Sequence, residues 1–215
     1  MAIVRVRQHV NPLSQKYKQS AAPPDWTKVY ADLSLPLHLD IGCGKGVFLL
    51  KMAQEQPDWN YLGLEIREPL VLEANLRSQE AGFTNLYYIF CNVNNSLRSL
   101  LSALPERSLH RISIQFPDPW FKKRHQKRRV VQPELVEELS LHLAPGGMVF
   151  LQSDVKDVEI EMCDRFQEHP AFARQDSVRK DSEWLEINPL AVPTEREQST
   201  LLRGEPVYRA VFIRK

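Results

Sequence analysis

The residues with the clearest chemical potential lie together in the stretch 116–129, which reads FPDPWFKKRHQKRR. It places a carboxylate, Asp118, between two prolines and two residues before Trp120. Because each proline fixes its own φ angle, the backbone around this acid is expected to be stiff. Six lysines and arginines lie between Lys122 and Arg129, a density that suits the phosphates of a polyanion. The alternatives are an acid that only organises a turn, and a run that is a solvated loop or a nuclear-localisation signal.

A second group of polar residues follows three short apolar stretches earlier in the chain. In chain order these residues are Asp40, Gly42, Gly44, Gly46, Glu65 and Asn92. Glycines let the backbone turn sharply and approach a ligand, a carboxylate can accept both hydroxyls of a ribose, and an amide can pair with an adenine edge. Taken singly, they also fit a structural turn, a solvated acid and a turn asparagine. Together they predict a nucleoside pocket.

The glycine loop has the form G-x-G-x-G, which differs from two common phosphate-binding motifs. Val47 stands where the dinucleotide fingerprint has its third glycine. The spacing of a P-loop and its Ser or Thr after the lysine are also missing. A nucleotide-dependent oxidoreductase is therefore disfavoured.

These residues need a scaffold that gathers them, and the chain alternates strand-like and helix-like stretches. The expected strands are 35–42, 60–66, 85–92, 109–116, 148–154, 172–180 and 206–215, and the expected helices are 46–57, 68–82, 96–104, 133–147 and 157–170. This alternation predicts an α/β fold with a doubly wound, mostly parallel seven-stranded sheet and helices on both faces. One strand near the C-terminus is expected to run antiparallel. Ligands of such sheets bind at the carboxyl ends of the strands.

The composition of the chain indicates its domain organisation, its compartment and how it could attract a polyanion. Residues 1–30 are proline-containing and aperiodic, which predicts an N-terminal extension that can be mobile, followed by a single domain over 31–215. No apolar run approaches the ~18 residues of a membrane span, and no signal-peptide core precedes the domain. The widely spaced Cys43, Cys91 and Cys163 predict neither disulfides nor a metal site, so we expect a reducing cytoplasm. With a net charge of +1, any polyanion must be attracted by a local patch.

Resemblance to the class I methyltransferases that use S-adenosylmethionine is carried by LDIGCGKG, LGLEI and FCN. A more specific resemblance, to the tRNA (guanine-N7)-methyltransferase family, is carried by QFPDPWFKKRH. It extends over nearly the whole chain, because RVRQHVNPL, LQSDV and PTERE also match that family's pattern. The resemblance implies a Rossmann-like fold and a tRNA partner, and the cysteine spacing adds the expectation of no metal. It leaves monomer or homodimer open.

The implied reaction moves a methyl group from S-adenosylmethionine to N7 of guanine 46 in the tRNA variable loop. The products are 7-methylguanosine and S-adenosylhomocysteine. N7 has a free lone pair and no proton, so no general base is needed at the attacking atom. The protein must align N7, methyl carbon and sulfur, and offset the charge arriving on the guanine. Asp118 suits both tasks, while Trp120 or Phe121 either packs in the core or stacks on the base.

Residue by residue, the resemblance implies that Asp118 is catalytic and also contacts the cofactor, alongside the six residues of the nucleoside pocket. The implied substrate contacts are Lys122, Asp154, Thr194, Glu195, Arg196 and Glu197. The implied RNA contacts are Arg124, His125, Gln126, Lys127, Arg128 and Arg129. Arg5, Arg7 and His9 could also touch RNA or belong to a disordered tail.

The last part of this assignment has open alternatives. Thr194-x-x-Glu197 is also a capping box ahead of a helix that Gly204 would stop. Arg196 stands where the family commonly has an aromatic residue, which puts that contact in doubt. The alternative for Asp154 is a helix N-cap or a loop acid.

Two other classes of function also fit part of the pattern. A non-catalytic RNA-binding module with a decayed pocket is opposed by the intact glycines, Glu65 and Asp118. A methyltransferase acting on an adenine amine usually has Pro-Pro-aromatic where this chain has Asp118-Pro119-Trp120.

Overall fold

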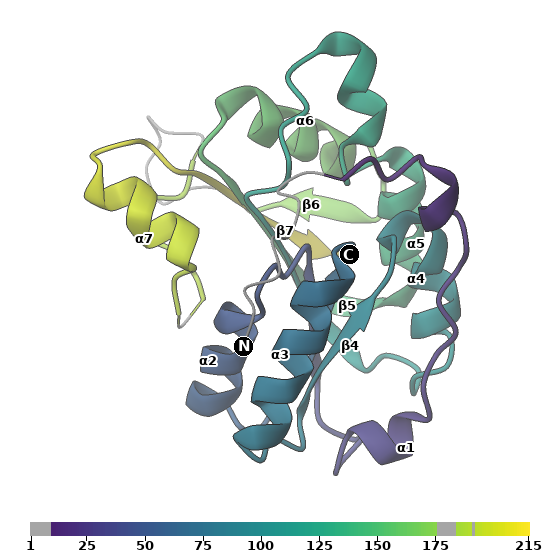
Figure 1. Ribbon diagram of the computed structural model, residues 1–215. Helices are drawn as coiled ribbons and strands as arrows, with labels where there is room; N and C mark the ends of the chain where they lie inside the picture. The colour runs from purple at the N-terminus through teal and green to yellow at the C-terminus, as the bar shows by residue number, and fades with distance from the viewer. Residues whose placement is uncertain (1–9, 176–183, 191) are drawn as a thin grey trace.

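The computed structural model describes residues 10–175, 184–190 and 192–215, and its centre is one seven-stranded sheet (Figure 1). The strands are β1 (Leu37–Ile41), β2 (Asn60–Glu65), β3 (Leu86–Phe90), β4 (Leu109–Gln115), β5 (Leu143–Ser153), β6 (Phe172–Arg174) and β7 (Tyr208–Arg214). Their order across the sheet is β3-β2-β1-β4-β5-β7-β6. Strands β1 to β5 are parallel, whereas β7 runs antiparallel to both of its neighbours. The predicted fold class is confirmed.

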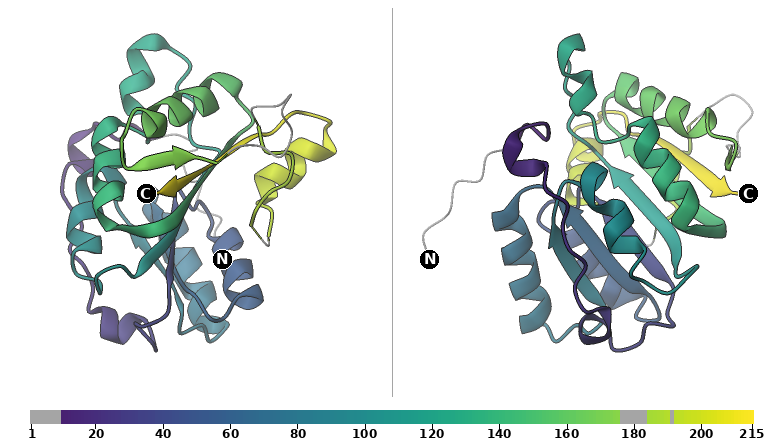
Figure 2. Two further views of the ribbon diagram at one scale, coloured as in Figure 1. Left: turned by 180° about the vertical axis from the view of Figure 1, so that it is seen from behind. Right: turned by 90° about the vertical axis from the view of Figure 1, so that its right-hand side faces the viewer.

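Helices cover both faces of this sheet (Figure 2). They are α1 (Trp26–Val29), α2 (Val47–Glu55), α3 (Glu68–Glu80), α4 (Val93–Leu101), α5 (Pro133–His142), α6 (Lys156–Gln167) and α7 (Glu195–Leu202), with 3-10 turns η1 (Gln15–Tyr17) and η2 (Lys123–Arg128). One apolar cluster joins the sheet to α4, α5 and α6, and a second joins it to α2 and α3. Every residue of β1 and β2 is therefore buried, as expected for parallel strands covered on both sides. Within the described residues, no helix is long and apolar enough to cross a membrane.

Several predicted element boundaries are wrong. The helix expected over 133–147 ends at His142, because Leu143 already pairs with Leu109 and begins β5. The helix expected from residue 96 begins three residues earlier, at Val93, since Asn92 caps it. Of the strand expected over 172–180, only Phe172–Arg174 forms β6, and residues 176–180 lie outside the described part.

The described part of the predicted N-terminal extension packs against the domain. Trp26 and Tyr30 belong to the main apolar cluster, and the Tyr30 hydroxyl donates a hydrogen bond to the Tyr61 carbonyl at 3.0 Å. Further upstream, the backbone N–H of Ala21 donates to Ser96 Oγ on α4 at 3.0 Å. The division at residue 31 stays a prediction.

Gly46 shows why the first strand-to-helix connection needs glycine. It caps α2 with a φ of 74°, in the left-handed region that disfavours other residues. A Cβ built there would lie 2.6 Å from Tyr88 and 2.9 Å from Ala74. The Tyr88 hydroxyl donates to the Gly46 carbonyl at 2.6 Å, so the loop, β3 and α3 close onto one another.

Replacing Gly46 with alanine should destabilise the fold more than the same change at Gly42. Both residues have a positive φ, which alone costs alanine about 1–2 kcal/mol. A Cβ at Gly46 would also overlap Tyr88, adding about 1–3 kcal/mol, whereas a Cβ at Gly42 meets no atom within 4 Å. Urea unfolding of the two variants measures both losses. Equal losses would contradict the close approach of Gly46 to Tyr88.

Candidate functional site

Two adjoining cavities open at the carboxyl ends of the parallel strands. The first lies beyond β1, β2 and β3, and the second lies between the β1 glycine loop, β4, β5 and the start of α7. Asp118, Gly42 and Arg67 line both cavities. Strand order reverses between β1 and β4, so this is the place where α/β sheets bind ligands.

Glu65 ends β2 at the first cavity, as predicted, and its buried carboxylate is fully engaged. Oε1 accepts hydrogen bonds from the backbone N–H of Arg67 at 3.0 Å and from its Nε at 2.9 Å. Oε2 accepts from the backbone N–H of Gly44 at 2.9 Å and from Arg67 Nη2 at 3.0 Å. The hydrogen bonds to Glu65 raise the pKa of Arg67, and the charges of Glu65 and Asp118 raise it further. Glu65 is therefore ion-paired rather than open to the cavity.

Asn92 also lies at the first cavity, and its amide is used within the protein. Its Oδ1 accepts from the backbone N–H of Asn94 at 3.3 Å, which caps α4. Its Nδ2 donates to the carbonyls of Pro12 and Tyr17 at 3.1 and 3.3 Å. Because Val10 and Pro12 line this cavity, Asn92 ties the N-terminal segment over it. The sequence indicated neither the cap of α4 nor the tie to the N-terminal segment, and the contact of Asn92 with adenine stays a prediction.

Asp40 is buried at the second cavity and belongs to a polar chain inside the sheet. Its Oδ1 accepts from Ser113 Oγ at 2.6 Å and from Gln115 Nε2 at 3.4 Å. Burial raises the pKa of Asp40 to about 6, while these two hydrogen bonds oppose the shift. Burial also lowers the pKa of His38 well below its usual value, so this imidazole is neutral. Since Ser113 donates to Asp40, it accepts from His38 Nε2, 2.9 Å away.

The loop that carries Asp118 is held in an unusual backbone conformation. Phe116 and Trp120 have φ values of 50° and 43°, which are rare for aromatic residues and cost of order 1–3 kcal/mol each. The backbone N–H of Phe116 donates to the Gln152 carbonyl at 2.8 Å, fixing the start of the loop. The Arg128 guanidinium lies 4.9 Å from the Trp120 ring centroid and supports its end. Surrounding contacts therefore determine where Asp118 lies.

The basic run divides into an exposed and a buried part. Lys122 is exposed and precedes η2, and four residues of that turn are also exposed: Lys123, Arg124, Gln126 and Lys127. Arg129 is only 8% exposed. Its Nε donates to the Pro119 carbonyl at 2.8 Å and its guanidinium pairs with Glu161. Arg129 thus supports the Asp118 loop, which does not fit its predicted role as an RNA contact.

Most of the predicted substrate residues line the second cavity, but one of them is buried away from it. Asp154, Thr194, Glu195 and Arg196 line it, and Arg196 Nε donates to Asp154 Oδ2 at 3.0 Å. Glu197 is buried behind them. The capping box that Thr194 and Glu197 predict is present, and α7 ends just before Gly204.

The two aromatic residues after Asp118 face different cavities. Trp120 lines the first cavity and packs edge-on against His125, with ring centroids 5.8 Å apart. Phe121 lines the second cavity and is 74% exposed. Of the two, Phe121 has the face open to a base.

Several residues of the site were not predicted. Ser113 and Gln115 are polar residues at alternating positions of a buried strand, which is a signal that the sequence did contain. Arg67 and Arg209 gave no such signal, because their roles depend on partners brought close by the fold.

The chain is similar to known methyltransferases over nearly its whole length. A family model described as "Putative methyltransferase" matches residues 34–210. The tRNA (guanine-N(7)-)-methyltransferase of Trichormus variabilis is 61% identical over 214 residues, covering 100% of this chain and 98% of its own. That of Synechococcus elongatus is 61% identical over 215 residues, covering 100% of this chain and 99% of its own.

Solved structures show the same architecture at low identity. The antibiotic-resistance methyltransferase Kmr gives a TM-score of 0.54 at 14% identity, covering 88% of this chain and 91% of its own. Precorrin-6y C5,15-methyltransferase from Geobacter metallireducens gives 0.53 at 12% identity, covering 84% and 80%. At such low identity these likenesses concern the fold alone.

Replacing Arg129 with methionine should lower the free energy of unfolding by about 1–3 kcal/mol, because the Pro119 carbonyl and the Glu161 carboxylate lose their partner. Replacing the exposed Lys127 in the same way should change it by less than about 0.5 kcal/mol. Denaturant unfolding of both variants measures the difference. If the Arg129 variant loses as little unfolding free energy as the Lys127 variant, Arg129 does not support the loop.

Proposed function

The chain belongs to the tRNA (guanine-N(7)-)-methyltransferase family, and we propose that it transfers a methyl group from S-adenosylmethionine to N7 of guanine 46 in the tRNA variable loop. The observation that carries the proposed arrangement is that Asp118 lines both cavities. A donor in the first cavity and a guanine in the second would meet beside this carboxylate. We also propose that residues 31–215 form one methyltransferase domain and that the reaction takes place in the cytoplasm.

The first cavity has features that fit the nucleoside of S-adenosylmethionine. Apolar side chains of Ile66, Cys91 and Val93 form its walls, and the backbone of Gly42 borders open space. Glu65 can accept the two ribose hydroxyls once the Arg67 guanidinium moves away, because only the two backbone N–H donors then remain on its oxygens. When bound, the sulfonium supplies the methyl group. Asp40 supplies a negative charge at the same end of the sheet above its pKa of about 6.

The second cavity suits the guanine. N7 carries a lone pair and no proton, so the chain has no proton to remove from the attacking atom. Asp118 accepts hydrogen bonds from guanine N–H groups and offsets the positive charge that forms on the ring. Phe121 offers an exposed aromatic face at this cavity on which a base can stack. Together these residues hold N7 in line with the bond to be broken.

The exposed part of the basic run suits the tRNA backbone. Lys122, Lys123, Arg124 and Lys127 extend from the end of the Asp118 loop and are open to solvent. Phosphate contacts of this kind position a nucleic acid, while a few side chains select the base. The run therefore guides the variable loop toward Asp118.

The proposed function is tested by incubating the purified protein with S-adenosylmethionine and tRNA transcribed without modifications. Mass spectrometry of nuclease digests should find 7-methylguanosine, and fragment mapping should place it at position 46. A transcript with adenine at that position is the control and should stay unmethylated. Methylation elsewhere would overturn the proposed position, and no methylation would overturn the activity.

Replacing Asp118 with asparagine should lower the rate of methyl transfer about 10²–10³-fold, the usual cost of losing a preorganised electrostatic partner. Affinity for S-adenosylmethionine should stay close to that of the unaltered protein, because Asp118 acts on the guanine and the transition state. Single-turnover kinetics and calorimetry measure the two quantities. Near-normal turnover would make Asp118 a structural turn residue.

Replacing Lys123, Arg124 and Lys127 with alanine should weaken tRNA binding and reduce its salt dependence. Each lost phosphate contact lowers the log–log slope by about 0.7–0.9, so the slope should fall by about two to three. Lys28→Ala is the control, because α1 lies at the opposite end of the molecule from η2 (Figure 1). Binding isotherms over a salt series give the slopes. An unchanged slope in the triple variant would mean that the RNA is held elsewhere.

A further inference from the structure

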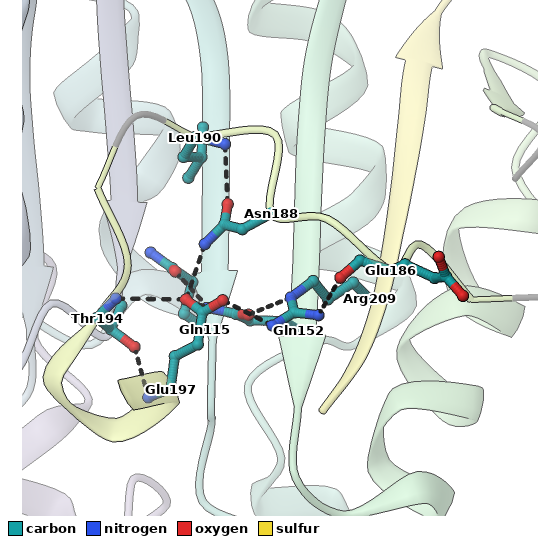
Figure 3. Close-up of polar contacts among 8 residues, drawn as sticks. All are labelled: Gln115, Gln152, Glu186, Asn188, Leu190, Thr194, Glu197 and Arg209. Atoms are coloured by element: carbon teal, nitrogen blue, oxygen red, sulfur yellow. Dashed lines mark hydrogen bonds and ion pairs between the residues drawn. The ribbon is translucent and has the colours of Figure 1, made fainter. Parts of the chain in front are cut away.

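Glu197 has the sequence position of a substrate contact, yet both of its carboxylate oxygens are occupied inside the protein (Figure 3). It is 1% exposed. Oε1 accepts from Arg209 Nη2 at 2.7 Å. Oε2 accepts from Asn188 Nδ2 at 2.7 Å, from Gln152 Nε2 at 3.2 Å and from the backbone N–H of Thr194 at 3.4 Å. The carboxylate therefore has no surface and little bonding capacity to offer to a tRNA.

Arg209, on β7, is equally enclosed. It is 5% exposed, and its guanidinium uses three nitrogens within the protein. Besides Glu197, it donates from Nε to Gln152 Oε1 at 3.3 Å and from Nη1 to the Glu186 carbonyl at 3.0 Å. A buried pair of this kind tolerates the loss of both charges far better than the loss of one, because a lone buried charge is not compensated.

The pair is connected to the start of the Asp118 loop. Gln152 Nε2 donates to Gln115 Oε1 at 2.7 Å, and Gln115 Nε2 reaches Asp40 Oδ1 at 3.4 Å. Gln115 is the last residue of β4, and the next residue, Phe116, donates its backbone N–H to the Gln152 carbonyl at 2.8 Å. Side chains from α7 and β7 therefore reach the strand end that carries the strained loop.

We propose that Glu197 and Arg209 are positioning residues and that Glu197 does not contact the tRNA. The pair fixes the start of α7, where Arg196 lines the second cavity, and acts through Gln152 on the beginning of the Asp118 loop. This inference rests on the proposed function, because one of its readouts is the methylation rate. Glu197 and Arg209 set the geometry of the site, and the residues that line the cavities contact the substrate.

A double-mutant cycle with Glu197→Gln, Arg209→Met and the combination tests the proposal. Each single variant buries one uncompensated charge, so each should lower kcat about tenfold or more, with the KM for tRNA changed less than about twofold. The combination should recover about tenfold relative to the worse single variant, a size that couplings between contacting residues reach. Rates are measured at a temperature well below the unfolding midpoint of each variant. Circular dichroism gives these midpoints.

Two further measurements keep the test decisive. Arg209→Lys keeps the charge but cannot reach Gln152 and Glu186 together, so it should lose less kcat than Arg209→Met and serves if the latter does not fold. Hydrogen exchange of the peptide 112–121 should speed up in Glu197→Gln, and this readout does not depend on activity. Failure of the unaltered protein to methylate tRNA would count against the proposed function alone.

Results typical of a residue that contacts the tRNA directly would overturn the proposal. In that case Glu197→Gln would raise the KM for tRNA about tenfold or more, the combined variant would be no better than that single variant, and exchange of the loop peptide would be unchanged.

Discussion

The polar side chains buried along the carboxyl edge of the sheet must satisfy one another, and the rest of the site depends on this constraint. Asp40, Gln115, Gln152, Glu197 and Arg209 come from β1, β4, β5, α7 and β7 and form one connected row. An unpaired member would cost free energy comparable to a lost buried hydrogen bond, or more if charged. The row therefore specifies how these five elements sit relative to one another. The two cavities of the site lie at the same edge of the sheet.

The same edge carries the backbone strain of the site. The left-handed aromatic residues Phe116 and Trp120 bracket the Pro-Asp-Pro segment, and contacts from Gln152, Arg128 and Arg129 hold it. Methyl transfer to an atom without a proton asks the protein for alignment more than for proton chemistry. A rigid, well-supported loop suits that demand. Part of the basic run acts as support, which explains why six cations follow the acid although only some are exposed.

The sequence predicted the sheet and the strand ends because both depend on local pattern. The alternation of apolar stretches identified β1 to β5, and the residues at their carboxyl ends line adjoining cavities, Glu65 with Asp118 in the first and Asp40 with Asp118 in the second. The motif match found Thr194-x-x-Glu197, whose capping box is local in sequence and therefore predictable. Boundaries such as the start of β5 at Leu143 were not predictable, since pairing with β4 overrides the glycines that would end a helix.

The direction of long side chains could not be predicted from the pattern. Arg129 is one of six similar cations in the sequence, and it turns inward because the Pro119 carbonyl and Glu161 on α6, 32 residues later, bind its guanidinium. Glu197 has the spacing of a contact residue, and only Arg209 and Gln152 show that it is buried. In the same way Asn92 is occupied by carbonyls from a segment about 80 residues earlier. These partners lie 10 to 80 residues away in the sequence, so no rule based on local spacing identifies them.

The ion pair between Glu65 and Arg67 has a consequence for the resting enzyme. The guanidinium neutralises this buried carboxylate and holds it in place. A ribose that replaces the guanidinium gains only the difference between its own hydrogen bonds and the charge-assisted ones it displaces. Because the proposed methyl donor and its product carry the same ribose, this exchange would weaken the binding of both by the same amount. Under the proposed function, a carboxylate that is held in place before the donor arrives would therefore come with a lower affinity for the donor and for its product.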